Sequence, residues 1–265
     1  MKRMIVTLGD LLLDVIVRLE QPLAEGADAD AVTQLGAGGQ AANVAAWVAA
    51  LGGTARFVGK RADDEAGRVA AEALNRYGVE VCGPVVEGRT GTVVSLVDTN
   101  GERTMASDRG VSPDLRADEL DPDWFLNEWL HLPGYSLLRS PIDEAAFWAA
   151  ELAEDVSVDL SSWSAIRDFG PERFRARLEE LEPDVVFANE AEEEIIGGRI
   201  TSTIWIVKQG PRGARFGDKE LPARSVKVVD TTGAGDAFAA GWILGGAELA
   251  LEAAARCVAK LGSMP

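Results

Sequence analysis

The chain has 265 residues, of which 47% are hydrophobic and 26% charged, so it can bury one large core and does not resemble a disordered protein. Its 26 basic and 43 acidic residues give a net charge of −17, which argues against nucleic acid or an anionic membrane surface as the main partner. Two cysteines and one histidine are too few for a disulfide framework or a multi-histidine metal site.

The N-terminal end carries no signal-peptide pattern. Met1-Lys2-Arg3 leads directly into the strand-like run Met4–Leu8. No apolar run approaches the length of a membrane span. We therefore expect a cytoplasmic protein with no membrane partner.

The first third of the chain mixes strands with two helices. Strands are predicted over Met4–Leu8, Leu13–Leu19, Val32–Leu35 and Arg56–Val58. Helices are predicted over Gln40–Leu51 and Asp63–Tyr77, and each is followed by glycine, a common helix stop.

The next stretch is rich in β-prone residues. Short strands are predicted over Val79–Val86, Gly91–Asp98 and Arg103–Ala106, with Thr99-Asn100-Gly101 as the hairpin turn between the last two. Together, the segments near 13–36 and 80–110 suggest a small sheet that stands off the main domain. Such a sheet can serve as a lid that excludes water from a reaction site.

The second half alternates strands and helices. Strands are predicted over Leu130–Leu132, Val156–Leu160, Val185–Ala188, Ile204–Lys208, Ala214–Phe216 and Val226–Val229. Helices are predicted near Ile142–Ala153, Pro171–Leu181 and Glu190–Ile196. This alternation indicates a parallel sheet covered by helices on both faces, hence a single α/β domain over residues 1–265 with the β lid inserted.

A glycine-rich turn near the C-terminus carries the main chemical signal. The stretch Val229–Gly241 reads as a strand end, a turn and a helix that continues through Leu244. A helix start presents unpaired N–H groups and a positive dipole, and Gly233 and Gly235 leave that backbone open to an anion. Asp236 would repel an anion, so it fits better as a proton acceptor, although an aspartate there can also cap a helix. An anion cradle beside a base suits phosphoryl transfer to an alcohol.

A second glycine motif opens the first predicted helix. In the sequence Gly38-Gly39-Gln40-Ala41-Ala42-Asn43, Gly39 lets a polyol lie against bare backbone. Asn43 offers both a donor and an acceptor to neighbouring hydroxyls. The alternative is a tight turn followed by a structural helical asparagine.

These two motifs together resemble the C-terminal and N-terminal signatures of the ribokinase-like (PfkB-type) carbohydrate kinases. The resemblance covers nearly the whole chain and implies a ribokinase-like three-layer α/β sandwich, with a mostly parallel central sheet and a small β lid. It implies an ATP-dependent transfer of the γ-phosphoryl group to a hydroxyl of a small sugar or sugar derivative. In that reaction Asp236 is the general base, and the backbone of Gly233, Ala234 and Gly235 holds the developing charge. Neither a P-loop nor a dinucleotide fingerprint matches.

The resemblance also assigns residues to the acceptor. They are Asp14, Gly38, Gly39 and Asn43, with Arg109 at a position where relatives vary with substrate. Arg109 is expected either to recognise a carboxylate or phosphate on the acceptor or to form an ion pair. Ribokinases proper place a sugar-binding glutamate just after the strand that ends here at Leu132-Pro133, and the absence of one counts against ribose itself.

Asn189-Glu190-Ala191-Glu192 resembles the family's Asn-x-x-Glu motif, which acts near the phosphates and hydrated Mg²⁺. Carboxylates often hold Mg²⁺ through its retained waters, so Glu192 is expected to act on the metal in this way. The alternative is an acidic first helical turn, which the helix dipole favours.

The loop at 208–214 resembles the strand-end loop that lies against the nucleotide in the same family. Its assigned residues are Lys208, Gly210 and Gly213, and the sequence leaves open whether Lys208 or Arg212 meets a phosphate. Asp230 and Thr232 match positions whose oxygen atoms coordinate a monovalent cation such as K⁺ in many relatives, although Asp230 can also be a turn residue.

Two other functions stay open at this point. Some members of the family phosphorylate nucleosides such as adenosine, inosine or pseudouridine, but no stretch here points to a pocket for a base. A non-catalytic sugar-binding relative is the second alternative, and the intact Asp236 argues against it. A homodimer formed through the lid edges is also left open.

Overall fold

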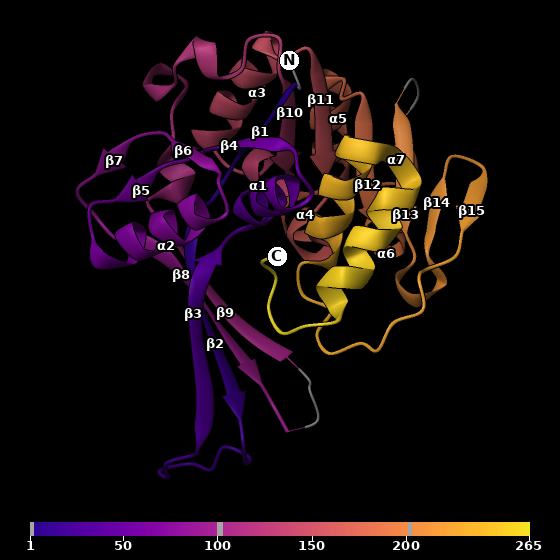
Figure 1. Cartoon of the computed structure of the whole chain (residues 1–265). Helices are drawn as coiled ribbons and strands as arrows, with labels where there is room; N and C mark the ends of the chain where they lie inside the picture. The colour runs from indigo at the N-terminus through magenta and orange to yellow at the C-terminus, as the bar shows by residue number, and fades with distance from the viewer. Residues whose placement is uncertain (1–2, 100–102, 201–202) are drawn as a thin grey trace.

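The computed structural model of the protein describes residues 3–99, 103–200 and 203–265, which form one large sheet, one four-stranded sheet and one two-stranded ladder (Figure 1). Within these residues the large sheet has nine strands. In spatial order they are β15 (Lys219–Leu221), β14 (Ala214–Phe216), β13 (Ile204–Lys208), β12 (Val185–Asn189), β11 (Asp155–Asp159), β10 (Trp129–Pro133), β1 (Met4–Leu8), β4 (Thr54–Val58) and β6 (Glu80–Cys82). From β6 to β13 all neighbours are parallel, and only β14 and β15 are antiparallel.

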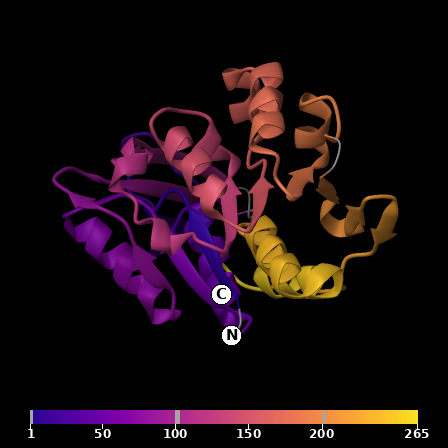
Figure 2. The same ribbon diagram turned by 90° about the horizontal axis from the view of Figure 1, so that it is seen from above.

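Helices cover both faces of this sheet (Figure 2). One face carries α1 (Gln40–Ala50), α2 (Glu65–Arg76) and α7 (Ala234–Val258), and the other carries α3 (Ile142–Leu152), α4 (Trp163–Phe169), α5 (Pro171–Leu181) and α6 (Glu190–Ile195). Side chains of β1 alternate between the two cores: Ile5 packs with α1, whereas Val6 and Leu8 pack on the opposite side. The expected three-layer α/β fold with a mostly parallel sheet is therefore confirmed.

The small sheet projects from the body as the sequence suggested (Figure 1). Its strands, in spatial order, are β3 (Ala31–Gly38), β2 (Leu12–Leu19), β8 (Thr90–Val97) and β9 (Arg103–Gly110). We call it the lid sheet. The predicted turn residues Asn100 and Gly101, between β8 and β9, lie outside the described residues.

The second expected lid segment, 80–110, begins too early. Glu80–Cys82 pairs in parallel with β4 in the large sheet, and β7 (Val85–Val86) forms a separate two-residue ladder with β5 (Arg61–Ala62). The cause is the helix α2 between β4 and β6, because a strand–helix–strand unit returns its second strand parallel to the first. The lid sheet therefore takes only β8 and β9 from this segment.

The predicted strand over Val226–Val229 is also wrong. These residues form an irregular connection in which Val226, Val228 and Val229 are exposed. The sheet ends at β15, and Pro222 follows it without a backbone N–H to continue a ladder. Further along, the N–H of Val229 bonds to the carbonyl of Val258 instead.

Two helical segments of the structure were not predicted from the sequence. The helix α4 was not predicted; Ser162 caps it by accepting a hydrogen bond from the N–H of Ala165 at 3.3 Å. The helix predicted through Leu244 ends near there, because Gly246 adopts φ 74° and ψ −161° and a second helical segment follows it within α7. By length and composition α7 passes as a candidate membrane span, but it is broken at Gly246 and packs on α1 in the core.

Candidate active site

Polar side chains gather at the carboxyl ends of the parallel strands. Asp159, Asn189 and Lys208 are the last residues of β11, β12 and β13, which are neighbours in the sheet. The turn before α7 reaches the same edge, because a Cβ placed on Gly235 would lie 3.2 Å from the Nζ of Lys208. In open parallel sheets this edge is where ligands bind.

Asp236 lies in the first turn of α7 and is 8% exposed. Its Oδ2 accepts a hydrogen bond of 2.7 Å from Nδ2 of Asn43, on α1. The helix cap is Gly233, at φ 75°, and no side chain caps the helix, so the capping alternative for Asp236 is not what the structure contains. The two glycine motifs of the sequence therefore meet through one side-chain hydrogen bond.

Burial raises the pKa of Asp236 to about 7. The hydrogen bond from Asn43 acts in the opposite direction, while the negative charge of Asp159 raises the pKa further. A carboxylate with a pKa near neutrality can accept a proton from an alcohol and release it again at physiological pH.

Lys208 supplies a positive charge beside the turn before α7. Its Nζ forms an ion pair of 2.5 Å with Oδ2 of Asp159, which is 1% exposed. Burial acts to lower the pKa of Lys208, but the carboxylates of Asp159 and Glu192 outweigh burial and raise it. The sequence left open whether Lys208 or Arg212 meets a phosphate, and Lys208 is the one whose ammonium lies beside the turn before α7.

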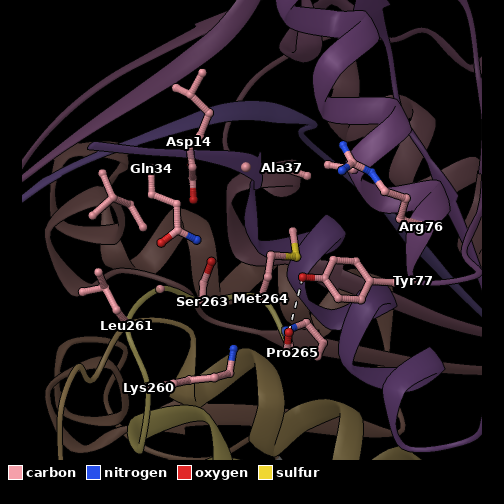
Figure 3. A pocket seen from close by; sticks show the side chains of 15 residues that line it. Asp14, Gln34, Ala37, Arg76, Tyr77, Lys260, Leu261, Ser263, Met264 and Pro265 are labelled. Atoms are coloured by element: carbon pink, nitrogen blue, oxygen red, sulfur yellow. Dashed lines mark hydrogen bonds between the residues drawn. The ribbon is translucent and has the colours of Figure 1, made fainter. Parts of the chain in front are cut away.

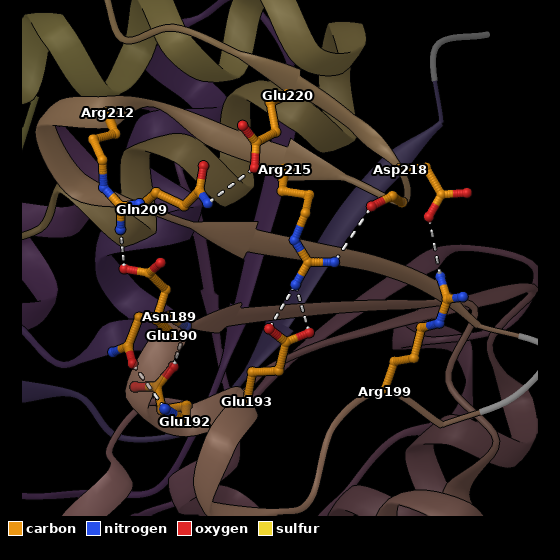
Figure 4. Close-up of polar contacts among 11 residues, drawn as sticks. Asn189, Glu190, Glu192, Glu193, Arg199, Gln209, Arg212, Arg215, Asp218 and Glu220 are labelled. Carbon is orange, nitrogen blue, oxygen red and sulfur yellow. Dashed lines mark hydrogen bonds and ion pairs between the residues drawn. The ribbon is translucent and has the colours of Figure 1, made fainter.

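Asn189 and Glu192 form a reciprocal capping box at the start of α6 (Figure 4). Oδ1 of Asn189 accepts from the N–H of Glu192 at 2.9 Å, and Oε2 of Glu192 accepts from the N–H of Asn189 at 2.8 Å. Glu192 is only 2% exposed, and burial together with the charge of Asp159 raises its pKa. The alternative of an acidic first helical turn is therefore observed, since both residues cap α6. The same capping contacts hold Glu192 near the charges of Asp159 and Lys208.

The loop after β13 turns through two glycines with positive φ, 59° at Gly210 and 109° at Gly213. A Cβ on Gly213 would lie 2.0 Å from the carbonyl oxygen of Leu221, so only glycine fits there. Arg212 in this loop pairs with Glu190 on the surface (Figure 4). The loop is therefore a tight turn beside Lys208 whose arginine is already occupied.

Asp14 and the glycines before α1 form the lid side of the site. The carboxylate of Asp14 fills the space over Gly38, where a Cβ would lie 1.9 Å from its Oδ1. Gly39 has φ 97°, and a Cβ there would lie 2.2 Å from the carbonyl oxygen of Asp10. Gly39 is therefore required by its backbone conformation, whereas Gly38 leaves the space that the Asp14 side chain of the lid sheet occupies.

A cavity of about 240 Å³ lies between the lid sheet, the end of α2 and the C-terminal segment 260–265 (Figure 3). Asp14 and Gln34 line it from the lid sheet, and Ser263 lines it from the opposite side. Oγ of Ser263 donates to Oδ1 of Asn43 at 3.1 Å, and Asn43 in turn donates to Asp236. A chain of hydrogen bonds thus connects this cavity with the candidate base.

Arg109 does not extend freely toward an acceptor. Its Nε donates to Oδ2 of Asp10 at 2.6 Å and its second nitrogen to Oδ1 at 3.0 Å, a bidentate pair. Its guanidinium also lies 5.9 Å from the ring centre of Tyr135. The ion-pair alternative is the observed one, and this pair ties β9 of the lid sheet to the end of β1.

Asp230 precedes the turn and organises the C-terminal segment. Its Oδ1 accepts from the N–H of Thr232 at 2.9 Å and its Oδ2 from the N–H of Gly262 at 2.8 Å. The thiol of Cys257 donates to the carbonyl of Thr232 at 3.2 Å. These contacts are those of a turn residue, and they place one negative charge beside the turn before α7.

Sequence reasoning missed two residues of this site. Asp159 lies in a predicted strand, and its place near the carboxyl end of that buried parallel strand is the signal that could have identified it. Ser263 lies in the C-terminal segment, and no local pattern in the sequence indicates its contact with Asn43. The remaining assigned residues lie on or next to the same edge of the sheet.

Comparison with known proteins gives one consistent family. The model of the pfkB family of carbohydrate kinases matches residues 2–264. The ATP-dependent ribose-1-phosphate kinase of Halopiger xanaduensis is 34% identical, over 96% of this chain and 90% of its own length. Fructokinase-1 of Zea mays is 33% identical, over 89% of this chain and 81% of its own. The crystal structure of adenosine kinase from Sinorhizobium meliloti has a TM-score of 0.87 at 24% identity, covering 100% of this chain and 96% of that one. The expected ribokinase-like fold is thereby confirmed.

Proposed function

Since the chain belongs to the pfkB family of carbohydrate kinases, we propose that it transfers the γ-phosphoryl group of ATP to a hydroxyl of a small sugar or sugar derivative, with Asp236 as the general base. The observation that carries this proposal is the placement of Asp236. It is buried, has a pKa of about 7, is held by Asn43, and lies in the helix turn that also faces Lys208.

The chemistry follows from that placement. The acceptor hydroxyl donates its proton to the ionised carboxylate of Asp236 as its oxygen attacks the phosphorus, and the bond to the leaving ADP oxygen breaks. The N–H groups of Gly235 and Asp236 precede the first bond within α7, which runs from the N–H of Ala237 to the carbonyl of Gly233. They are therefore available to phosphoryl oxygens, and Lys208 adds a positive charge beside them.

The acceptor is oriented from the lid side. Asp14 accepts hydrogen bonds from sugar hydroxyls, and Asn43 offers its amide to a neighbouring hydroxyl. Gly38 leaves room for the carboxylate of Asp14 itself, and Gly39 leaves room for the carbonyl of Asp10, so the acceptor-binding side chain lies close to the start of α1. The ion pair between Asp10 and Arg109 holds the lid sheet in place over it.

The site offers oxygen ligands for two metal ions, Mg²⁺ near Glu192 and a monovalent cation near Asp230. Among the described residues no group of three or more His, Cys, Asp or Glu side chains could hold a metal by itself. Asp159 and Glu192 nevertheless leave negative charge around Lys208, and Mg²⁺ is commonly held by few carboxylates together with water and substrate phosphates. Bound there through water to Glu192, and close to Asn189, Mg²⁺ would neutralise charge on the phosphates. A monovalent cation such as K⁺ fits the charge of Asp230 and the carbonyl of Thr232, and we assign it no step in the reaction.

The relatives favour a sugar as acceptor. The two relatives described above, at 33% and 34% identity, are named for fructose and ribose 1-phosphate, whereas adenosine kinase, at 24% identity, shows the fold alone. The lack of a glutamate after β10 argued against free ribose, and a phosphorylated or ketose acceptor is compatible with that lack. A nucleoside acceptor is the second candidate, and a non-catalytic binding protein the third.

ADP release in the presence of ATP and Mg²⁺ tests the proposal. The acceptor panel contains fructose, ribose, ribose 1-phosphate and adenosine, and KCl is varied against NaCl. We expect turnover with at least one sugar and none with Asp236→Asn, which retains the shape of the side chain. Asp143→Asn serves as the matched control, because Asp143 is also buried but pairs with Arg177 on the other face of the large sheet.

Each candidate predicts a different result in this panel. Turnover with adenosine alone would favour the nucleoside kinase. Sugar binding without phosphate transfer by the wild-type protein would favour the non-catalytic relative. An Asp236→Asn variant as active as the wild type would refute the role of the base, even if the kinase activity itself were found.

The lid sheet also offers surfaces for a homodimer. Its edge strands β3 and β9 carry the exposed apolar residues Val32, Leu35 and Met105. Exposed edge strands with apolar side chains are prone to pair with another sheet. We expect light scattering to report a dimer, and Leu35→Glu to convert it to a monomer.

A further inference from the structure

Asp159 is a buried carboxylate at the end of β11 that neither sequence motif includes. Its side chain is 2% exposed, and both of its oxygens have partners. Oδ2 binds the ammonium of Lys208 at 2.5 Å, and Oδ1 accepts from the N–H of Ser161 at 3.0 Å. A buried carboxylate with two such contacts has a fixed position, because loss of the lysine would leave its charge unpaired and loss of the N–H would leave one oxygen without a donor.

The loop that holds Asp159 is itself fastened to the acceptor side. Ser161 adopts φ 72°, an uncommon conformation for a residue other than glycine. Its hydroxyl donates to Oε1 of Gln40 at 2.5 Å and accepts from the N–H of Gly134 at 2.8 Å. Gln40 is the first residue of α1, the helix that carries Asn43. The position of Asp159 is thus fixed relative to α1, the helix whose Asn43 binds Asp236.

Lys208 depends on that anchor. Its four-carbon side chain carries a point charge that can be placed in many ways, so it acts at one location only when a partner holds it there. Three carboxylates raise its pKa by their charge, those of Asp159, Glu192 and Asp236, and Asp159 is the one whose oxygen contacts its ammonium in the described part of the chain. Held by Asp159, the ammonium lies against Gly235 and leaves the Asp236 carboxylate to its bond with Asn43.

We propose that Asp159 is a positioning residue of the phosphoryl-transfer site, which holds Lys208 against the turn before α7 and keeps it from pairing with the catalytic base Asp236. This inference rests on the proposed function. The negative charge of Asp159 also acts electrostatically on the pKa of Asp236, as do the charges of Lys208 from β13 and Asp14 from β2. Loss of Asp159 would therefore act on the base in two ways, by removing a negative charge and by releasing a positive one toward it.

The test is a double-mutant cycle of Asp159→Asn and Lys208→Met, measured by ADP release with the acceptor that the wild type prefers. We expect Asp159→Asn to lower kcat by about 10- to 100-fold while KM for the acceptor changes by less than about threefold. The acid limb of its pH–rate profile should move to lower pH by roughly one unit, because the remaining charges favour the ionised base. In the Lys208→Met background the same substitution should lower kcat no further.

A purely structural role gives a different pattern. It would lower kcat equally with and without Lys208 and would leave the acid limb where it is, and either result overturns the inference. Should Asp159→Asn alone fail to fold, the neutral double variant still tests the idea, since it should match Lys208→Met in kcat. An active wild type with an unaffected Asp159→Asn overturns only this inference, whereas a wild type that transfers no phosphoryl group overturns the proposed function as well.

Discussion

Replacing Asp236 with asparagine is expected to stabilise the unliganded protein at pH 8 while abolishing phosphoryl transfer. In the fold the pKa of this carboxyl is raised by burial from 3.8 to about 7. A group whose pKa is higher in the folded state binds its proton more tightly there. Its contribution to stability is therefore complete below about pH 4 and is lost as the pH rises through 7.

The size of the effect follows from that difference. A rise of about 3 units corresponds to roughly 4 kcal/mol at 1.36 kcal/mol per unit, which we take as an upper limit. Asparagine carries no charge and can still accept the hydrogen bond from Asn43. The variant should therefore match the wild type near pH 4 and exceed it progressively up to pH 8, where a protein of this size gains roughly 2 °C in Tm per kcal/mol.

Chemical denaturation at pH 4, 6 and 8 without ligands measures this difference directly. The control Asp143→Asn breaks the 2.8 Å ion pair with Arg177 and should lower stability at pH 6 and 8. An Asp236→Asn variant that is less stable than the wild type at pH 8, or more stable by the same amount at every pH, would refute the conclusion that burial raises the pKa of Asp236. Such a gain in stability on loss of a functional group is typical of active sites.

Three further predictions concern the neighbours of the base. Asn43→Leu removes a hydrogen bond to a charged group worth about 1.5–3 kcal/mol, so the acid limb of kcat/KM should rise by roughly 1–2 pH units; an unchanged limb would mean that it belongs to another group. Gly39→Ala should cost on the order of 3 kcal/mol or more in unfolding experiments, because of its φ of 97° and the carbonyl of Asp10, whereas Gly36→Ala, with no neighbour within 4 Å, should be close to neutral. Asp10→Asn and Arg109→Lys should raise KM for the acceptor by similar factors if their pair only holds the lid sheet; a rise in Arg109→Lys alone would show that the arginine contacts the acceptor.

Local sequence specified the elements that build the site. Ala-rich, helix-forming segments follow both glycine motifs, and their glycines have the positive φ or the close contacts that only glycine allows, at Gly39 and Gly233. The apolar runs that became β1, β10, β11, β12 and β13 are short and bounded by polar residues, so their strand character could be predicted from composition alone. These features depend on neighbours within a few residues.

Errors arose where the partner of a segment lies elsewhere in the chain. Val226–Val229 has the composition of a strand, but no strand edge is available to it in the described part of the chain, so it stays irregular and exposed. Glu80–Cys82 looked like part of the lid sheet, and the crossover through α2 brought it beside β4 instead. In both cases pairing, and not propensity, decided the outcome.

The sequence by itself therefore determined the order and type of most elements, although not α4 or the connection at Val226–Val229, together with the two glycine motifs and the identity of the candidate base. Only the tertiary structure decided which charges surround that base. The contacts of Asp236 with Asn43 and of Lys208 with Asp159 join residues 193 and 49 positions apart. The elevated pKa of Asp236 arises from burial and from these distant charges, which no local pattern encodes.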